Sequence, residues 1–400
     1  MFSESWLHRS SLGCVSTSLA LDPQASRGSA SIMPRCNYLN YLTADWHHIG
    51  RVQFVNRTYK GATLALYRDN YEYGAVREKI TELSLTEATE NEDWGLVPGA
   101  SYDPNIFNGS DVAALFYDKS VTYEIDKSIA DIQCRSAFDN PTQVNAFISM
   151  LYNGIDKSIA VKNEELAKRT LNMMIGQTIA AEFPSVVDNN YSSSTGVKAV
   201  NLLYAYNQKF SKSLTASNCL YDEDFLMWAA MTIRRYSVRM TSMSTLFNIG
   251  GLPRFTPRDL QHVVLHGDFS TAADMYLRSN VFHDELIQMP DYVELPYWQG
   301  SGTDFDLTST GKIDVVVPNG SGTKNIVLTG ILGVIFDHDA CGITNEQPRV
   351  DSNYNAKANF TNVFYKQKAS YFCDKNASSL FAGLAAWAQS GNGGLREPFI

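Results

Sequence analysis

The sequence has few cysteines, and none of them form a recognisable motif. The six cysteines are scattered along 400 residues, and no two have the Cys-x-x-Cys spacing of zinc clusters or thioredoxin-type redox sites. A long chain with dispersed cysteines is typical of a protein made in a reducing compartment. We therefore expect neither a zinc cluster nor a cysteine redox motif.

Long apolar runs are also missing. A membrane-spanning helix needs about 20 consecutive apolar residues, and no segment of this chain has that length and uniformity. The first 34 residues are rich in Ser and Ala, and polar residues interrupt their apolar stretch Val15–Leu21, unlike the continuous core of a signal peptide. We expect these residues to form a flexible arm, and we expect no membrane partner. Translation from Met33 is a second hypothesis.

A concentrated basic surface is absent from the sequence. The chain carries 33 Lys and Arg against 42 Asp and Glu, and its densest basic group is Arg234, Arg235 and Arg239 inside a helical pattern. A protein that grips DNA directly usually carries a basic stripe along one face. The composition therefore argues against a nucleic-acid-binding protein.

Histidine and acidic residues occur close together at two places, but neither has the spacing of a known catalytic motif. His262 and His266 are four residues apart and Asp268 follows, so the two rings would share one face of a strand or helix. Because HExxH is absent and no third ligand is apparent, we interpret both as structural histidines on an apolar strand. The Asp-His-Asp segment Asp337–Asp339 precedes Cys341 without a GxSxG elbow. We predict a turn there, since Asp side chains hydrogen-bond the nearby backbone.

Phosphate-binding loops are missing as well. Gly320–Lys324 contains Gly, Ser, Thr and Lys, but not in the GxxxxGK[ST] order, and no predicted helix follows it. Without a catalytic, cofactor-binding or metal-binding constellation, we expect a structural or binding protein rather than an enzyme.

Apolar residues at three- and four-residue spacing predict a series of amphipathic helices. The first begins at Pro141, where the missing N–H costs nothing, and its apolar face reaches Ile159. A second is predicted from Glu164 to just before Pro184. Further helices are predicted over Val197–Ser211, from Asp222 to about Met243, and over Ser270–His283.

Strand signals lie between and after these helices. Leu260–Leu265 and Ile331–Phe336 have the composition of buried strands. Ile313–Val317 and Ile326–Leu328 predict a hairpin, because Asn319-Gly320 between them tolerates positive φ. Since no βα unit repeats, the predicted fold class is α+β.

An acidic excursion precedes the helices. The run Glu78–Asp93 is rich in carboxylates, and two strand-forming stretches frame it, Tyr59–Tyr67 and Ala113–Ile125. We expect two long strands with a solvated, turn-rich segment between them.

The last part of the chain is dense in aromatic residues. Within Ile331–Leu384, an apolar strand and the Asp-His-Asp turn are followed by an extended segment with a lone Arg349 and then by a run with Phe364-Tyr365. With the segments before it, this ending resembles the major capsid proteins of short-tailed, podovirus-like tailed bacteriophages, which have the Hong Kong 97-type fold. The similarity covers roughly residues 50–387, and its other carriers are Arg77–Ile80 (REKI), Ala137–Ile159, Phe255–Leu260 (FTPRDL) and Asn353–Asn355.

The resemblance implies five parts. These are an N-terminal arm (1–57), an extended E-loop hairpin with flanking strands (58–130), a P-domain with a long spine helix (131–196), an A-domain (197–330), and a return to the P-domain with a C-terminal strand (331–400). In that family the E-loop reaches over a neighbouring subunit. The acids that we expect to contact neighbours are Glu82, Glu87, Glu90, Glu92 and Asp93.

The resemblance also implies the function. We expect a major capsid protein that self-assembles through hexamers and pentamers into the icosahedral or prolate head of a tailed phage. The head would enclose double-stranded DNA without sequence-specific binding, and scaffold, portal and cement or head-fibre proteins would be partners. Assembly is expected in the cytoplasm of the bacterial host, the mature location is the virion, and no cofactor is expected.

Two other hypotheses stay open at this point. Another virion part, such as a portal, adaptor or tail-tube protein, would share the structural character, although a portal should show a longer helical stem. A metallohydrolase using His262, His266 and Asp268 is the enzymatic alternative.

Overall fold

A computed structural model describes residues 57–58, 67–71, 76–83, 88, 90, 92–102, 105, 107, 109, 111–131, 141–185, 191, 194–279, 291–299, 311–319, 322–374 and 382–385. The chain forms two compact units. Unit 1 consists of Met1–Thr58, Glu124–Lys157 and Arg349–Lys366. Unit 2 consists of Tyr59–Tyr123, Ser158–Pro348 and Gln367–Ile400. The expected arm over residues 1–57 lies almost wholly outside the described residues.

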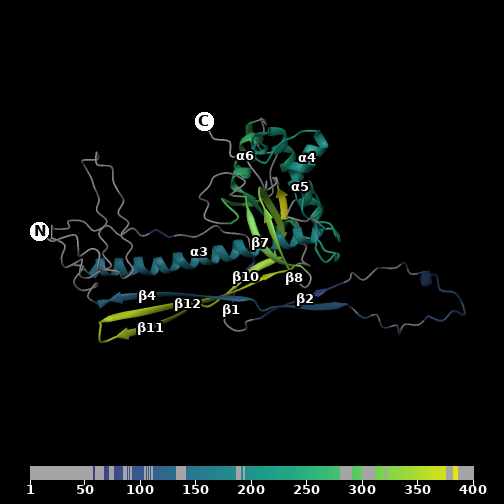
Figure 1. Cartoon of the computed structure of the whole chain (residues 1–400). Helices are drawn as coiled ribbons and strands as arrows, with labels where there is room; N and C mark the ends of the chain where they lie inside the picture. Colours follow the sequence, from purple (N-terminus) through teal and green to yellow (C-terminus); the bar gives the residue numbers. More distant parts are fainter. Residues whose placement is uncertain are drawn as a thin grey trace. The chain divides into compact units, whose positions relative to one another are not determined.

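One long helix, α3, replaces the two helices predicted between Pro141 and Pro184. It runs without interruption over Pro141–Glu182, 42 residues, so the predicted break before Glu164 is wrong (Figure 1). No proline or glycine occurs in residues 155–164, and the side chains of Lys168 and Glu164 form an ion pair of 2.9 Å across one helical turn. The predicted start at Pro141 and the end before Pro184 are confirmed.

A four-stranded sheet in the order β13-β9-β5-β6 lies at the centre of unit 2. Its strands are β5 (Gln261–His266), β6 (Tyr292–Leu295), β9 (Ile331–Asp337) and β13 (Ala382–Ala385). The strands predicted at Leu260–Leu265 and Ile331–Phe336 are thus confirmed. Both faces of the sheet are covered, since neighbouring residues of β5 belong to different clusters: Val264 packs in one apolar core, and Val263 and Leu265 pack in the other.

Three helices cover one of these cores: α4 (Leu202–Phe210), α5 (Glu223–Met240) and α6 (Gly267–Ser279). The helix predicted over Val197–Ser211 begins later, because Asn201 is its N-cap and its side-chain oxygen accepts from the Tyr204 N–H at 3.0 Å. The start of α5 after Asp222 is confirmed, while α6 begins three residues before the predicted Ser270. The predicted end of α6 at His283 lies outside the described residues.

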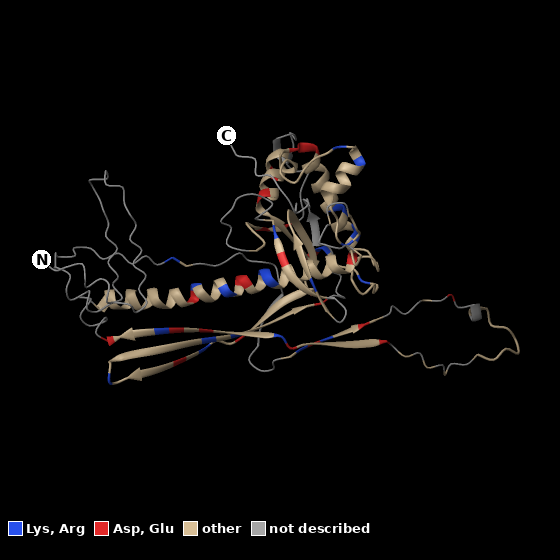
Figure 2. Cartoon of the chain, viewed as in Figure 1, with Lys and Arg blue, Asp and Glu red and all other residues tan. Residues whose placement is uncertain are grey.

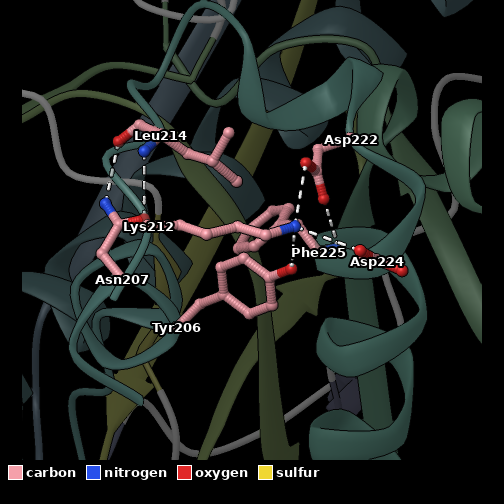
Figure 3. Close-up of polar contacts among 7 residues, drawn as sticks. All are labelled: Tyr206, Asn207, Lys212, Leu214, Asp222, Asp224 and Phe225. Carbon is pink, nitrogen blue, oxygen red and sulfur yellow. Dashed lines mark hydrogen bonds and ion pairs between the residues drawn. The ribbon is translucent and has the colours of Figure 1, made fainter. Parts of the chain in front are cut away.

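A lysine joins α4 to the start of α5 (Figure 3). The Lys212 Nζ lies 3.1 Å from the Tyr206 hydroxyl and 3.0 Å from Asp224, and Asp222 is 3.6 Å away. Asp222 also caps α5 by accepting from the Phe225 N–H at 2.8 Å. The hydrogen bond to Tyr206 and those carboxylates raise the pKa of Lys212. Lys212 therefore offsets part of the negative charge at the N-terminus of α5.

The predicted hairpin forms from β7 (Ile313–Asn319) and β8 (Gly322–Leu328), paired antiparallel from Ile313↔Leu328 to Asn319↔Gly322. It packs closely on α3. A Cβ added to Gly176 would lie 2.5 Å from the Val315 Cγ2 atom, so only glycine fits at this approach.

A second sheet consists of five strands: β1 (Tyr67–Tyr71), β4 (Ser120–Ala130), β10 (Cys341–Glu346), β11 (Arg349–Asn355) and β12 (Phe360–Cys373). In unit 2, β10 pairs parallel with β1 and antiparallel with the end of β12. In unit 1, β11 pairs with the start of β12, and Lys366 forms an exposed ion pair with Glu124. The aromatic-dense ending is therefore strand.

The acidic excursion contains a shorter hairpin than predicted. Its strands are β2 (Arg77–Glu82) and β3 (Val112–Tyr117), followed after two residues by β4. The strand predicted at Tyr59–Tyr67 lies outside the described residues except for Tyr67, which begins β1. The stretch predicted as one strand at Ala113–Ile125 is divided between β3 and β4, and β2, which was not predicted, extends into the acidic run. Short 3-10 helices complete the described elements: η2 (Glu92–Gly95), η3 (Cys219–Tyr221) and η4 (Arg258–Leu260). Within the described residues, no helix combines the length and apolarity that a membrane crossing requires.

Candidate assembly site

The β2–β3 hairpin presents two chemically different faces. The strands pair antiparallel from Arg77↔Tyr117 to Glu82↔Val112, so alternate side chains point to opposite sides. Arg77, Lys79 and Tyr117 belong to the half-buried face, which we call the inward face.

The other face of the hairpin, the outward face, is exposed and largely apolar. Ile80 is 64% exposed, Val112 58% and Phe116 65%. Further along the excursion, Trp94 is 83% exposed and Phe107 92%. Large apolar side chains at such exposure are typical of a surface that another molecule covers.

An ion pair anchors the inward face. The Lys79 Nζ lies 2.6 Å from the Asp374 carboxylate, whose side chain is only 1% exposed, and it donates to the backbone carbonyl of Asp339 at 3.2 Å. The Asp374 N–H donates to the Ala340 carbonyl at 2.7 Å. The hairpin is thus tied to the turn between β9 and β10 and to the end of β12.

Aromatic contacts support the same anchor. The Arg77 guanidinium lies 4.2 Å above the Phe372 ring, and the Tyr117 ring centroid is 5.6 Å from that of Phe372. Burial, followed by the negative charge of Asp374, raises the pKa of Tyr117, so its hydroxyl stays protonated. The Arg254 guanidinium adds a contact from the loop after α5, since its Nη2 donates to the Glu82 carbonyl at 2.8 Å.

The five predicted contact acids are placed unevenly. Glu82 ends β2 with its side chain on the outward face, and Glu90 is exposed. The backbone of Glu92 and Asp93 begins η2, but their side chains lie outside the described residues, as does the whole of Glu87. The structure assigns none of the five to an intramolecular ion pair that it describes, and their contact with neighbours stays a prediction.

The Asp-His-Asp turn is confirmed. The Asp337 carboxylate accepts from the Asp339 N–H at 2.8 Å, and the Asp337 carbonyl accepts from the Ala340 N–H at 3.0 Å. The same carboxylate accepts from the Thr256 hydroxyl at 2.7 Å. The acid therefore builds the turn.

The histidines of β5 do not converge on one another as a metal pair would. The His262 Nε2 lies 2.8 Å from the His338 Nδ1, and burial followed by the neighbouring ring lowers the pKa of His262. His266 is buried beside Asp268, with 3.7 Å between ring nitrogen and carboxylate. Among the residues whose positions are described, no three His, Cys, Asp or Glu side chains gather as metal ligands would.

The sequence reasoning missed Lys79, Asp374 and Tyr117. Arg77–Glu82 lacks the apolar alternation that would indicate its inward face, because its one large apolar residue, Ile80, points outward. Nothing in the sequence indicates that Lys79 has a partner almost 300 residues away. Similarly, nothing local indicates that His262 meets His338.

Comparison with known proteins identifies the family. A model of the Phi29-like phage major capsid protein family matches residues 37–381, most of the chain. A search of curated proteins gave no match. Among solved structures, a capsid chain of Staphylococcus phage Andhra is 10% identical over 84% of this chain and 87% of that one, with a TM-score of 0.50. A chain from the structure of the head fibre and inner core protein gp22 of native bacteriophage P68 is 9% identical over the same shares, with a TM-score of 0.51.

These similarities decide between the hypotheses left open by the sequence. At such low identity the structures show the fold alone, and it is the α+β Hong Kong 97-type fold predicted above. The family match favours a major capsid protein over a portal, adaptor or tail-tube protein and over a metallohydrolase. The chain belongs to the Phi29-like phage major capsid protein family, whose members build the shell of the phage head.

Proposed function

We propose that copies of this chain associate as hexamers and pentamers that close into an icosahedral or prolate head around double-stranded DNA. The outward face of the β2–β3 hairpin carries this proposal. Ile80, Val112 and Phe116 are all more than half exposed, and they lie on one side of one hairpin. Full burial of a side chain of this size contributes about 1.5–3 kcal/mol. A neighbouring subunit lying against this face would supply that burial.

The acids of the excursion are proposed to add ion pairs to this contact. Glu82, Glu87, Glu90, Glu92 and Asp93 are proposed to face basic groups on neighbouring subunits. Exposed ion pairs contribute only about 0–1 kcal/mol each. They would therefore select the register of the contact, while the apolar side chains provide most of its free energy.

The remaining parts of the proposal concern partners and location. The net charge of -9 suits a container that holds DNA without binding a particular sequence. Scaffold, portal and cement or head-fibre proteins are proposed partners, and the similarity to a P68 structure that contains a head fibre supports the last of these. Assembly is proposed in the cytoplasm of the bacterial host, and we propose no catalytic role and no cofactor.

Negative-stain microscopy of the purified chain, alone and with its scaffold, tests the proposal. We expect closed shells. Rings of fixed symmetry without shells would favour another virion part, and a strictly monomeric protein in the presence of scaffold would contradict self-assembly.

A further inference from the structure

Helix α5 carries an exposed stripe that no other described element covers. The stripe consists of Met231, Arg234, Arg235, Val238 and Arg239, at the spacing that brings residues onto one helical face. Met231 is 47% exposed and Val238 45%. Two further exposed apolar residues, Met243 and Leu246, follow the helix in the chain. The opposite face of α5 is buried, with Phe225, Leu226, Ala229 and Ile233 in the core.

The arginines of the stripe have no acidic partner in the part of the chain that the structure describes. The Arg235 guanidinium donates to the Met231 sulfur at 3.9 Å, and the Arg239 guanidinium lies 5.6 Å from the Tyr236 ring centroid. No acid occurs in the sequence between Asp224 and Asp259. Figure 2 shows the resulting contrast along α5, with acidic residues at its start and basic residues in its second half.

The mixture of side chains favours a protein partner over DNA. Arginine and methionine are enriched at protein interfaces, where the arginine fork pairs with carboxylates. A phosphate backbone would use the arginines but would leave Met231, Val238, Met243 and Leu246 in water.

The chain that follows the stripe contacts the β2–β3 hairpin. Arg254, in the loop after α5, donates to the Glu82 carbonyl at the end of β2 at 2.8 Å. In a ring of identical subunits, one side of each copy meets a different side of the next. The stripe must then meet another surface of the next copy rather than that copy's own stripe.

The α6–β6 edge of the four-stranded sheet has the complementary chemistry. Asp268, Asp274, Asp291 and Glu294 lie on α6 and on or beside β6, the last strand of the sheet. Arg278, one residue before the end of α6, is the only Lys or Arg in residues 267–279 and 291–299. The two elements are joined, since Glu294 accepts from the Ser270 hydroxyl at 2.9 Å. Met275 on α6 is 69% exposed. The acids that begin α5 are less suited, because Lys212 already pairs with Asp222 and Asp224.

We propose that the α5 stripe of one copy docks on the acidic α6–β6 edge of the next copy of this chain. The inference rests on the proposed self-assembly and adds to it a charge-matched lateral contact, separate from the hairpin. Arginine–carboxylate pairs would set the register, and the methionines and Val238 would exclude water around them.

Charge reversal tests the contact. The variant Arg234→Glu/Arg235→Glu is compared with Lys209→Glu/Lys312→Glu, which makes the same change in net charge at two exposed lysines elsewhere in unit 2. Circular dichroism melts establish that both variants fold, and sedimentation with negative-stain microscopy measures the shell fraction. We expect the shell fraction to fall about tenfold or more in the arginine variant and less than about twofold in the lysine variant. Only the arginine variant places new carboxylates opposite the acids of the α6–β6 edge across the proposed contact.

A rescue variant identifies the partner surface. Because each copy supplies both sides of the contact, adding Asp268→Lys/Asp291→Lys to the arginine variant should restore shells to within about threefold of wild type. Rescue by reversing the hairpin acids instead, normal assembly of the arginine variant, or loss of DNA retention without loss of shells would overturn the inference while leaving self-assembly intact. Failure of the wild-type chain to form shells with scaffold would overturn both.

Discussion

At the scale of single residues, the best-defined contact is the buried Asp374 carboxylate with its cation. The cation is Lys79, on the inward face of the hairpin, and its side chain is only 19% exposed. Removing one partner of a buried ion pair leaves an uncompensated charge, which costs more than the intact pair contributes.

We therefore expect Lys79→Ala to destabilise the unassembled subunit by about 3–5 kcal/mol in denaturant unfolding. Hydrogen exchange should show the loss of protection at β2 and β3 first. Lys366→Ala is the matched control, because its pair with Glu124 is roughly half exposed on both sides and should contribute at most about 1 kcal/mol. Equal effects of the two substitutions would contradict the anchoring role.

The contact between His262 and His338 gives a second residue-scale prediction. Burial and the neighbouring ring lower the pKa of His262 below its ordinary 6.5, so the unfolded chain binds a proton more readily than the folded one. Stability should therefore fall as the pH drops through about 6.5 toward the lowered pKa. Chemical denaturation between pH 5 and pH 7.5 measures the slope. His262→Gln should flatten it, and an unchanged slope would rule out this histidine as its source.

At the scale of elements, the continuity of α3 and its fit to the β7–β8 hairpin matter most. The two glycines of the helix, Gly154 and Gly176, have opposite surroundings. A Cβ at Gly154 would meet nothing within 4 Å, whereas one at Gly176 would lie 2.5 Å from Val315.

Gly154→Ala and Gly176→Ala should consequently change stability in opposite directions. The first should stabilise α3 by about 0.5–1 kcal/mol through helix propensity alone. The second should cost about 1–3 kcal/mol, because β7 must move away from the helix. Thermal melts of the two single variants make the comparison, and a shift of the same sign in both would contradict the close approach at β7.

At the scale of the whole molecule, the exposed side chains of the hairpin belong to an assembly rather than to one subunit. Ile80→Ser/Phe116→Ser should leave the melting temperature of the subunit nearly unchanged, because both side chains already lie in water. Shell yield measured by sedimentation should fall strongly, since each lost burial weakens every copy of the contact. Ala114→Ser, on the same face, is the control and should assemble normally. A normal shell yield from the double variant would show that the outward face is not an interface.

Predictions from the sequence succeeded where the governing contacts are local. Pro141 at a helix start, Asp222 as an N-cap and the Asp337 turn each depend on partners within a few residues. The prediction of two helices in place of α3 failed because Glu164 looks like an acid in the first turn of a new helix, whereas in the folded chain it pairs with Lys168 one turn later in a continuous helix. The hairpin strands were misplaced because charged residues in Arg77–Glu82 conceal a strand whose lysine is buried by an ion pair.

The amino-acid sequence by itself determined the α+β class, the family resemblance and the absence of a recognisable catalytic motif. These follow from composition, periodicity and the order of segments, which need no knowledge of the chain's path. The tertiary structure alone decided that Lys79 meets Asp374, that His262 meets His338, and that the arginines of α5 have no acidic partner among the described residues. Such pairings join residues far apart in the chain, and their free energies depend on distance and burial, which exist only once the backbone has folded.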